Sequence, residues 1–265
     1  MRFFSTGFTD IGIRKKSNQD SYCIKIADTE IGQVALVAVA DGMGGLQKGE
    51  LASSYAIKEL SNWFEEKLPQ SLEIMNNSTS GLESFLTGQW SGIVQELNLK
   101  IMSYGKDNHM KLGTTLTVLL VVGARYSIVH VGDSRVYEIN SSGKVKKLTE
   151  DQTFVRREIS EGRMTEEEAA IHPKRNVLLQ CIGSSKKVEP EVVHGNLKKD
   201  ACYLVCSDGF RHQLSDSQIA ELNYFGKDSY EEFANNKIKE LIKFDIEHGE
   251  SDNLTAAVLK VDGSR

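Results

Sequence analysis

Residues 34–42 read VALVAVADG, a run of seven apolar residues that ends in Asp41 beside a glycine. An unbroken apolar run of this length is typical of a β-strand that is covered on both faces. Two further apolar runs end at an aspartate in a similar way, IVHVGD at 128–133 and YLVCSDG at 203–209. We therefore expect Asp41, Asp133 and Asp208 to project beyond the ends of buried strands, where a site can be assembled on a rigid scaffold.

Strand-like runs rich in Val, Ile and Leu recur along the chain. They predict strands at residues 34–40, 116–122, 126–131, 136–139, 203–206 and 255–261. The predicted long helices are grouped between these strands and do not alternate with them one to one. An α+β fold of antiparallel sheets with helices outside therefore fits better than a doubly wound parallel sheet.

Helical spacing of apolar residues marks the other elements. One helix is predicted from just after Gly49 to before Pro69, with Leu51 on its apolar face, and a second over residues 93–104, with Tyr104 on its face. Capping-box patterns at Thr165 and Ser229 predict two more. The polar stretch 76–88 indicates a loop, and residues 150–182 indicate an excursion over the surface.

Composition narrows the class of protein. The 265 residues carry 32 Lys and Arg against 37 Asp and Glu, a net charge of −5, which argues against a general nucleic-acid binder. The chain has three prolines and no Gly/Ser/Pro-rich linker, so we expect a single domain over residues 1–265. It shows neither a signal-peptide pattern nor an apolar span, which predicts a cytoplasmic protein without membrane contact. The four cysteines lack a CxxC pair and are expected to be free thiols.

Five aspartates in all stand beside the ends of predicted strands. Asp252 precedes the last strand, and Asp20 precedes the alternating run SYCIKI. One Asp-Gly at a strand end is usually only a turn, but five carboxylates brought together would repel one another without a cation. Oxygen donors alone favour Mg²⁺, Mn²⁺ or Ca²⁺ over zinc or copper. Two such ions roughly 3.5–4 Å apart could activate a water for in-line attack on a phosphoester.

Eight ordered motifs carry a family resemblance. They are TDIGIRKKSNQDSY, VAVADGMGG, GTTLTVLLV, HVGDSRVYEI, LTEDQTFV, HPKRNVLLQCIG, VCSDGF and SDNLTAAVL. The set resembles the metal-dependent protein phosphatases, the type 2C Ser/Thr phosphatases, and in particular their compact bacterial branch, which often has methionine after the Asp-Gly. The resemblance runs from about residue 5 to residue 261. It implies a four-layer αββα fold, in which a central β-sandwich of two antiparallel sheets is flanked by helices, with a binuclear metal centre at one end.

The resemblance also implies a ligand set. Asp41 would bridge two tightly bound Mn²⁺ or Mg²⁺ ions, and the Gly42 carbonyl would bind one of them. Asp208 and Asp252 would complete the second. The activity implied is hydrolysis of phosphoserine and phosphothreonine on proteins by metal-activated water, which reverses the action of a Ser/Thr kinase. The partners implied are phosphoproteins and an opposing kinase, and the chain is expected to be a monomer.

Three more positions receive roles from the same resemblance. Asp20 would hold a metal-bound water, and Asp133 together with Asp208 would bind a looser third ion. Asn253 would steady its neighbour Asp252 from behind the ligands.

The phosphate-binding position departs from the family pattern. The family usually has arginine five residues before the Asp20 position, where this chain has Lys15 with Arg14 beside it. Lysine lacks the bidentate fork of arginine. If this segment is a strand, alternation sends the two side chains to opposite faces, and a bulge could bring Arg14 inward instead. Both remain candidates, beside the alternative that the run Arg14–Lys16 is only a solvated basic surface.

Other departures concern the histidines. Met43 stands where many eukaryotic relatives have a proton-donating histidine, and Gln152 also stands where relatives often have histidine. None of the six histidines is adjacent to a proposed ligand in the sequence, so surface or packing roles are expected for them.

Two other functions compete with the phosphatase interpretation. A non-catalytic relative is disfavoured because all the main aspartates are present. A metal-dependent nuclease is disfavoured by the net charge of −5 and by the lack of a basic, aromatic surface.

Overall fold

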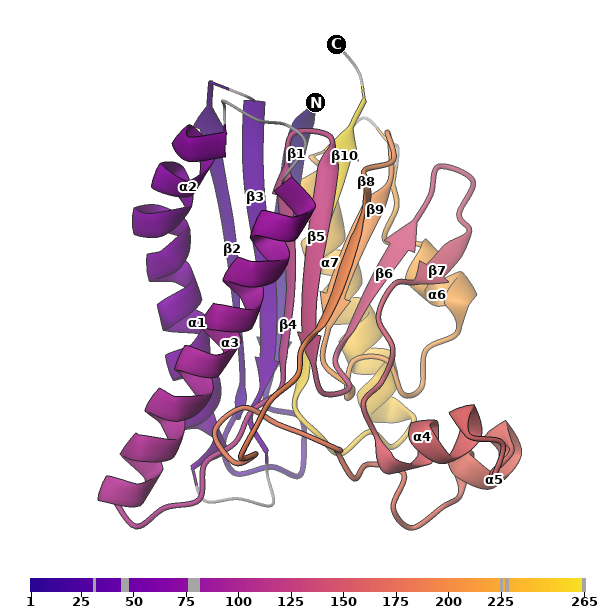
Figure 1. The fold of residues 1–265 in the computed structure, drawn as a ribbon. Coiled ribbons are helices and arrows are strands. Elements are labelled where there is room, and N and C mark those ends of the chain that lie inside the picture. The colour runs from indigo at the N-terminus through magenta and orange to yellow at the C-terminus, as the bar shows by residue number, and fades with distance from the viewer. Residues whose placement is uncertain (31, 44–47, 76–81, 225, 227–228, 264–265) are drawn as a thin grey trace.

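The computed structural model describes residues 1–30, 32–43, 48–75, 82–224, 226 and 229–263. Within these residues the strands form two antiparallel sheets of five strands each (Figure 1). One sheet has the order β1 (Arg2–Asp10), β10 (Leu254–Asp262), β9 (Cys202–Cys206), β6 (Arg135–Ile139) and β7 (Val145–Lys147). The other has the order β2 (Asp20–Thr29), β3 (Gly32–Asp41), β4 (Leu116–Val122), β5 (Arg125–Val131) and β8 (Glu191–Asn196). All six strands predicted from apolar runs are confirmed, and β1, β2, β7 and β8 are additions.

The two sheets pack face to face, and alternation along β3 explains why its sequence is apolar throughout. Val37 and Val39 share a core with side chains of β9 and β10 in the facing sheet. Leu36 and Ala38 point the other way and pack in a second core beneath helices. Because both faces of the strand are covered, both sets of alternate positions must be apolar.

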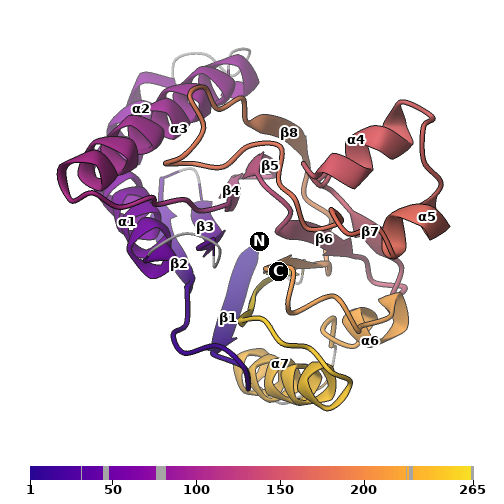
Figure 2. The same ribbon diagram turned by 90° about the horizontal axis from the view of Figure 1, so that it is seen from below.

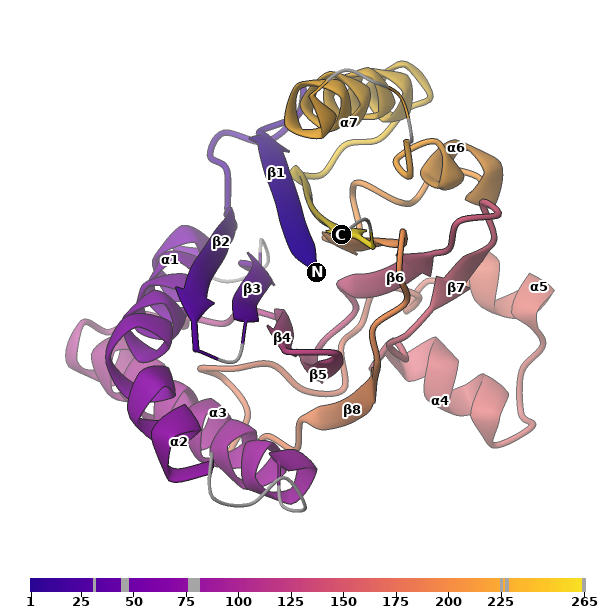
Figure 3. The same ribbon diagram turned by 90° about the horizontal axis from the view of Figure 1, so that it is seen from above.

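Helices cover the outer face of each sheet, as Figures 2 and 3 show. On the sheet that contains β3 lie α1 (Gly49–Asn62), α2 (Leu68–Met75) and α3 (Leu82–Asp107). On the other sheet lie α6 (Asp216–Ala220) and α7 (Tyr230–Glu247). The short helices α4 (Phe154–Ser160) and α5 (Glu166–Ala170) lie below β6 and β7 in Figure 1. The four-layer αββα fold expected from the sequence is thereby confirmed.

The first long helix does not end before Pro69, contrary to the sequence prediction. α1 continues through a π-helical turn, Trp63–Lys67, directly into α2. The π turn interrupts the usual hydrogen-bond spacing just before the proline, so Pro69 falls in the first turn of α2, where its missing N–H is tolerated. Trp63 of the π turn is buried against Trp90 of α3, with ring centroids 5.0 Å apart.

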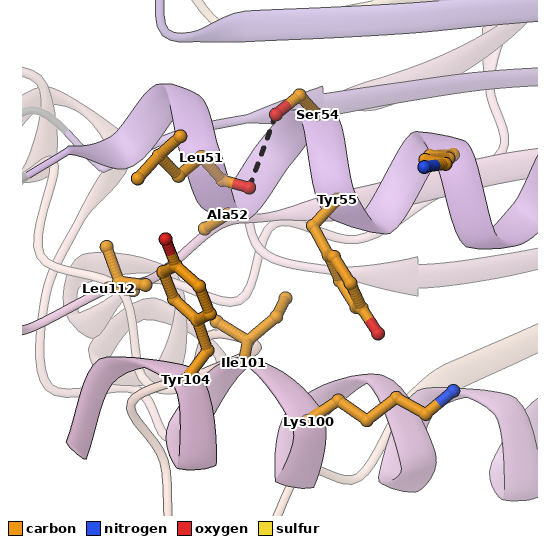
Figure 4. A pocket seen from close by; sticks show the side chains of 9 residues that line it. Leu51, Ala52, Ser54, Tyr55, Lys100, Ile101, Tyr104 and Leu112 are labelled. Carbon is orange, nitrogen blue, oxygen red and sulfur yellow. Dashed lines mark hydrogen bonds between the residues drawn. The ribbon is translucent and has the colours of Figure 1, made fainter. Parts of the chain in front are cut away.

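Leu51 and Tyr104 are more exposed than their helical spacing predicts, at 37% and 49%. Both line an apolar pocket of about 300 Å³ between α1 and α3, together with Ile101 and Leu112 (Figure 4). The two helices therefore do not close completely at this point.

The remaining local predictions have mixed outcomes. The capping box at Thr165 is confirmed, because its side chain accepts a hydrogen bond from the Glu168 N–H and the Glu168 carboxylate accepts one from the Thr165 N–H. The box at Ser229 is wrong, because this side chain donates to the Glu231 carboxylate and does not cap α7. Part of the predicted loop 76–88 belongs to α3, and residues 76–81 lie outside the described residues. The excursion at 150–182 carries α4 and α5.

The fold also bears on membrane contact and on the state of the cysteines. In the described part of the chain, no helix is both long enough and apolar enough to cross a membrane. The four cysteines are free, as predicted, with Cys23 half-buried and the other three buried.

Candidate metal centre

The aspartates predicted from strand ends gather at one end of the sandwich, the lower end in Figure 1. Asp20 opens β2 and Asp41 closes β3, and the two residues are direct partners in the antiparallel register. Asp133 lies between the end of β5 and the start of β6. Asp208 follows β9, and Asp252 precedes β10, its neighbour in the sheet. Antiparallel pairing places the end of one strand beside the start of the next, so five separate segments meet.

The backbone around Asp41 is fixed on both sides. Its N–H donates to Thr115 Oγ1 at 2.9 Å, and its carbonyl accepts from the Thr115 N–H at 2.8 Å. The next N–H, that of Gly42, donates to the Gln19 carbonyl at 3.0 Å. A Cβ on Gly42 would lie 2.4 Å from the Gly49 carbonyl oxygen, so only glycine fits between these segments.

At the proposed centre, two buried carboxylate oxygens lack a hydrogen-bond donor, and this observation tests whether a cation fits there. Asp20 Oδ2 accepts hydrogen bonds from Ser207 Oγ at 2.8 Å and from Thr255 Oγ1 at 2.6 Å. Asp20 Oδ1 and Asp208 Oδ1 are buried without a hydrogen-bond partner among the described residues. A buried acceptor left unpaired is costly, and a hard cation bound by oxygen would remove that cost.

The carboxylates strongly perturb one another. Burial, followed by the charges of Asp20, Asp208, Asp133 and Asp252, raises the pKa of Asp41 well above its usual value. Burial is also the main cause that raises the pKa of Asp20 and of Asp133 to about 7. No three carboxylate, imidazole or thiol groups of the described residues yet form a complete set of metal ligands. Ionised carboxylates this buried repel one another, and a bound cation would offset that repulsion.

This electrostatic strain predicts an unusual pH dependence for the metal-free protein. Asp20 and Asp133 bind protons more tightly in the folded than in the unfolded chain, so their contribution to stability falls as pH rises from about 4 to about 7. Thermal unfolding in EDTA should therefore show a higher midpoint near about pH 5.5 than near about pH 7.5. Mn²⁺ at the higher pH should restore the midpoint. Equal metal-free midpoints at both values would contradict the inferred repulsion.

The segment that carries Arg14 and Lys15 is a loop, which corrects the argument from strand alternation. β1 ends at Asp10 and β2 begins at Asp20, and turns occupy the residues between them. Lys15 Nζ lies 2.6 Å from Asp252 Oδ1, whereas Arg14 is exposed. Burial alone would lower the pKa of Lys15, but the hydrogen bond and charge of Asp252, with the charges of Asp41 and Asp208, raise it. Of the two candidates, Lys15 is the cation beside the carboxylates.

Asn253 binds this loop to the end of β10. Its Oδ1 accepts from the Gln19 N–H at 2.9 Å, and its Nδ2 donates to the carbonyls of Ile11 at 2.9 Å and Ser17 at 3.2 Å. The side chain thus holds the segment on either side of Lys15. Only its backbone N–H reaches Asp252, donating to Oδ1 at 2.8 Å, so the expected role of Asn253 in steadying Asp252 stays a prediction.

His212 and Glu250 are site residues that the sequence analysis missed. His212 Nε2 lies 3.6 Å from Asp208 Oδ2, so this histidine is beside a proposed ligand in space although it is not adjacent to one in the sequence. Its Nδ1 lies 2.8 Å from Glu250 Oε2. The other oxygen, Glu250 Oε1, accepts from the backbone N–H groups of Ser251 at 2.6 Å and Asp252 at 2.8 Å. The buried Glu250 carboxylate therefore connects Asp208 with Asp252.

The charges of Glu250 and His212 stabilise each other. Burial alone would raise the pKa of Glu250, but hydrogen bonds from His212, Asp252 and Ser251 lower it to about 2. Burial alone would lower the pKa of His212, but the bond to Glu250 and the charge of Asp208 raise it. The pair therefore holds both neighbouring aspartates in a defined arrangement.

Glu250→Gln should weaken binding of metal ions. An amide has one carbonyl oxygen, so it cannot accept from both His212 and the two backbone N–H groups. Loss of such a supporting contact typically lowers metal affinity about 10- to 100-fold. Calorimetric titration of the metal-free protein with Mn²⁺ measures this directly. Glu247→Gln, at an exposed position three residues earlier, is the matched control, and equal affinities in the two variants would contradict the role.

The comparisons with known proteins show the family of the chain. The sequence profile of protein phosphatase 2C matches residues 13–244. The Ser/Thr protein phosphatase PstP of Mycobacterium tuberculosis is 31% identical over 253 residues, which cover 96% of this chain and 44% of PstP. The chain thus spans less than half the length of this relative. It belongs to the protein phosphatase 2C family.

Solved structures of bacterial phosphatases share the fold. The S. agalactiae serine/threonine phosphatase superposes with a TM-score of 0.81 and 31% identity, covering 98% of this chain and all of that one. The catalytic domain of PstP in complex with two manganese ions gives 0.75 and 29%, covering 98% of this chain and 99% of that one. The expected family and the expected α+β sandwich are therefore both confirmed.

Proposed function

We propose that this chain hydrolyses phosphoserine and phosphothreonine on proteins at a centre that holds two Mn²⁺ or Mg²⁺ ions. The observation that carries the proposal is the cluster of buried aspartates with two unpaired carboxylate oxygens, at the end of a sandwich shared with Ser/Thr phosphatases. Asp41, the Gly42 carbonyl, Asp208 and Asp252 would hold the ions. When bound, the ions supply an activated water and neutralise charge on the phosphoryl group.

The surrounding residues position this set. Asp41 is central, because the charges of the other four aspartates all raise its pKa. The hydroxyls of Ser207 and Thr255 fix one oxygen of Asp20 and leave the other free to accept a metal-bound water. Asp133, whose carbonyl accepts from Arg211 Nη2 at 3.3 Å, supplies the carboxylate for a looser third ion.

A turnover assay with a phosphothreonine peptide tests the proposal. Hydrolysis should require Mn²⁺ or Mg²⁺ and stop in excess EDTA, because every proposed ligand is an oxygen donor. An oligonucleotide substrate serves as the control for a nuclease. Full activity in EDTA, or cleavage of the oligonucleotide alone, would overturn the assignment.

The alternatives have less support. A non-catalytic relative needs no cation, yet the fold brings the carboxylates together with two oxygens unpaired. A nuclease needs a cationic track for the phosphate backbone, and the net charge is −5.

The remaining parts of the proposal concern the cellular setting. We propose phosphoprotein substrates, an opposing Ser/Thr kinase, a cytoplasmic location, a monomeric state and one domain over residues 1–265. The sheets support the single domain, since residues of both share one apolar core. Light scattering and limited proteolysis test the last two statements.

The proposed function makes a direct prediction about the role of Lys15 in substrate binding. Its ammonium stands beside Asp252, so it can pair with a phosphoryl group at the centre. Lys15→Ala should raise KM about three- to tenfold, the range for loss of a partly exposed charge-assisted contact. Lys15→Arg should lower KM or leave it unchanged, because the fork offers two parallel bonds. Steady-state kinetics on one phosphopeptide measures both.

Arg14→Ala is the control for this series. The Arg14 side chain is exposed on the neighbouring position of the loop and should have little influence on KM. A rise in KM for Arg14→Ala with none for Lys15→Ala would reverse the assignment. No change in any of the three variants would show that the basic run is only a solvated surface.

A further inference from the structure

A polar cleft adjoins the proposed metal centre. Its volume is about 910 Å³, and Asp133 and Asp252 line one part of it. One wall comes from α4, α5 and the turn after α5, and the other from residues 211–213 and 249–252. Figure 2 views this end of the molecule, with α4 and α5 at the side of the sandwich. The cleft is large enough for several residues of a peptide that leads away from the phosphoresidue.

The carboxylates of the cleft that are not part of the proposed metal centre already have partners. Asp151 accepts from Arg135 Nε at 2.7 Å and Nη2 at 2.6 Å. Burial alone would raise the pKa of Asp151, but the Arg135 hydrogen bond and the charges of Arg211 and Arg135 lower it. Glu166 pairs with Arg156 at 2.7 Å. Glu250 is engaged by His212 and by two backbone N–H groups.

Two arginines of the cleft retain unused donors. Arg211 Nη2 donates to the Asp133 carbonyl at 3.3 Å and lies 3.5 Å from Asp151, a carboxylate that Arg135 already binds with two bonds. Its Nε is buried without a partner in the described residues. Arg175 is exposed in the turn after α5, where its backbone N–H donates to the His172 carbonyl at 3.0 Å. No described carboxylate pairs with the Arg175 side chain. Outside the proposed metal centre, four arginines therefore line the cleft with three carboxylates, those of Asp151, Glu166 and Glu250.

From this imbalance we infer that the cleft selects phosphoprotein segments that carry a second anionic group near the phosphoresidue, bound by Arg175 and Arg211. The inference rests on the proposed phosphatase function. Guanidinium groups bind planar or tetrahedral anions through parallel N–H bonds. A second anion can be an Asp or Glu side chain or a second phosphoryl group. Both would enter the same cleft once the metal centre had engaged the first phosphate.

Four peptides with the same phosphothreonine test the inference. One has alanine flanks, one has glutamates in the flanking positions, one has a second phosphoserine there, and one has lysines there. The wild-type protein should show a kcat/KM about three- to tenfold higher for the glutamate or doubly phosphorylated peptide than for the alanine peptide. The glutamate and phosphoserine arms distinguish the two sources of the anion.

Arg175→Ala should reduce this ratio toward one, chiefly through KM of the anionic peptide, and Arg175→Glu should reverse it in favour of lysine flanks. Because Arg175 is exposed, both variants should fold. Lys174→Ala is the matched control, since this exposed lysine lies over the Phe154 ring and not in the cleft. It should keep the wild-type ratio.

The outcomes separate the two proposals. Metal-dependent hydrolysis of all four peptides with equal efficiency would overturn the cleft inference and leave the phosphatase function standing. Equal losses of the ratio in the Arg175 and Lys174 variants would also overturn it. Failure to hydrolyse any of the peptides with Mn²⁺ present would overturn the phosphatase function itself.

Discussion

Asp41→Asn should lower kcat at least about 100-fold, roughly 2.7 kcal/mol of transition-state stabilisation. Asp41 is the aspartate that feels the charges of all four others, and its backbone is fixed through Thr115. An amide keeps the shape of the side chain but removes the charge of a ligand proposed to contact both ions. Turnover of a phosphopeptide at saturating Mn²⁺ measures the loss. Retention of more than about a tenth of wild-type kcat would contradict the bridging role.

The same substitution should stabilise the metal-free protein. The carboxylate of Asp41 is buried among like charges, and its neutral replacement removes that repulsion. Each kcal/mol gained should raise the unfolding midpoint by about 2–4 °C in a chain of this size. Asp28→Asn, at an exposed position near the far end of the same strand pair, should change neither kcat nor the unfolding midpoint. A lower midpoint for Asp41→Asn in EDTA would show that the activity is lost through unfolding.

The sandwich could be predicted because its central strands have sequences that are recognisable as strands. β3, β4, β5 and β9 are covered on both faces, so their sequences are mostly apolar along their whole length. β8 lies at a sheet edge and is only half-buried, and β7 has three residues. Patterns that short or that mixed do not distinguish a strand from a loop. Pro69 misled the helix prediction because a π-helical turn cannot be anticipated from spacing.

The proposed ligands were also predictable, because each stands at the end of a strand that the sequence marks. The supporting residues were not. His212 reaches Asp208 from one turn along the chain, and it is held there by Glu250, 38 residues away. Arg175 and Arg211, 36 residues apart in the sequence, line the same cleft only because of how the chain folds. Such contacts depend on tertiary packing, which a single sequence does not report.

The choice between Arg14 and Lys15 shows the same limit. Alternation is a sound argument only within a strand, and residues 11–19 form a loop between β1 and β2. Asn253 determines the path of this loop through three hydrogen bonds from the far end of the sequence. The side chain that faces the carboxylates is therefore decided by a residue more than 200 positions away.

Gly42→Ala should disable the centre through the backbone, with every proposed carboxylate ligand still in place. The added Cβ would lie 2.4 Å from the Gly49 carbonyl oxygen and 2.6 Å from the Gln19 carbonyl oxygen. Both atoms belong to the main chain, so neither can turn aside as a side chain does. Relief of the overlap should cost about 1–3 kcal/mol of stability. It should also displace the Gly42 carbonyl, and a shift of about 1 Å at a reacting centre can cost about 100-fold in rate.

Gly92→Ala separates this effect from a general response to replacing glycine. Gly92 is exposed in α3, and an added Cβ would meet nothing within 4 Å. It should therefore stabilise the protein by about 0.5–1 kcal/mol and leave kcat unchanged. Thermal unfolding, Mn²⁺ calorimetry and phosphopeptide turnover on both variants give the comparison. The Gly42→Ala protein could instead bind Mn²⁺ and hydrolyse the phosphopeptide as well as the Gly92→Ala protein does. In that case the close approach of the Gly42 and Gly49 backbones does not shape the centre, and the Gly42 carbonyl is not a ligand.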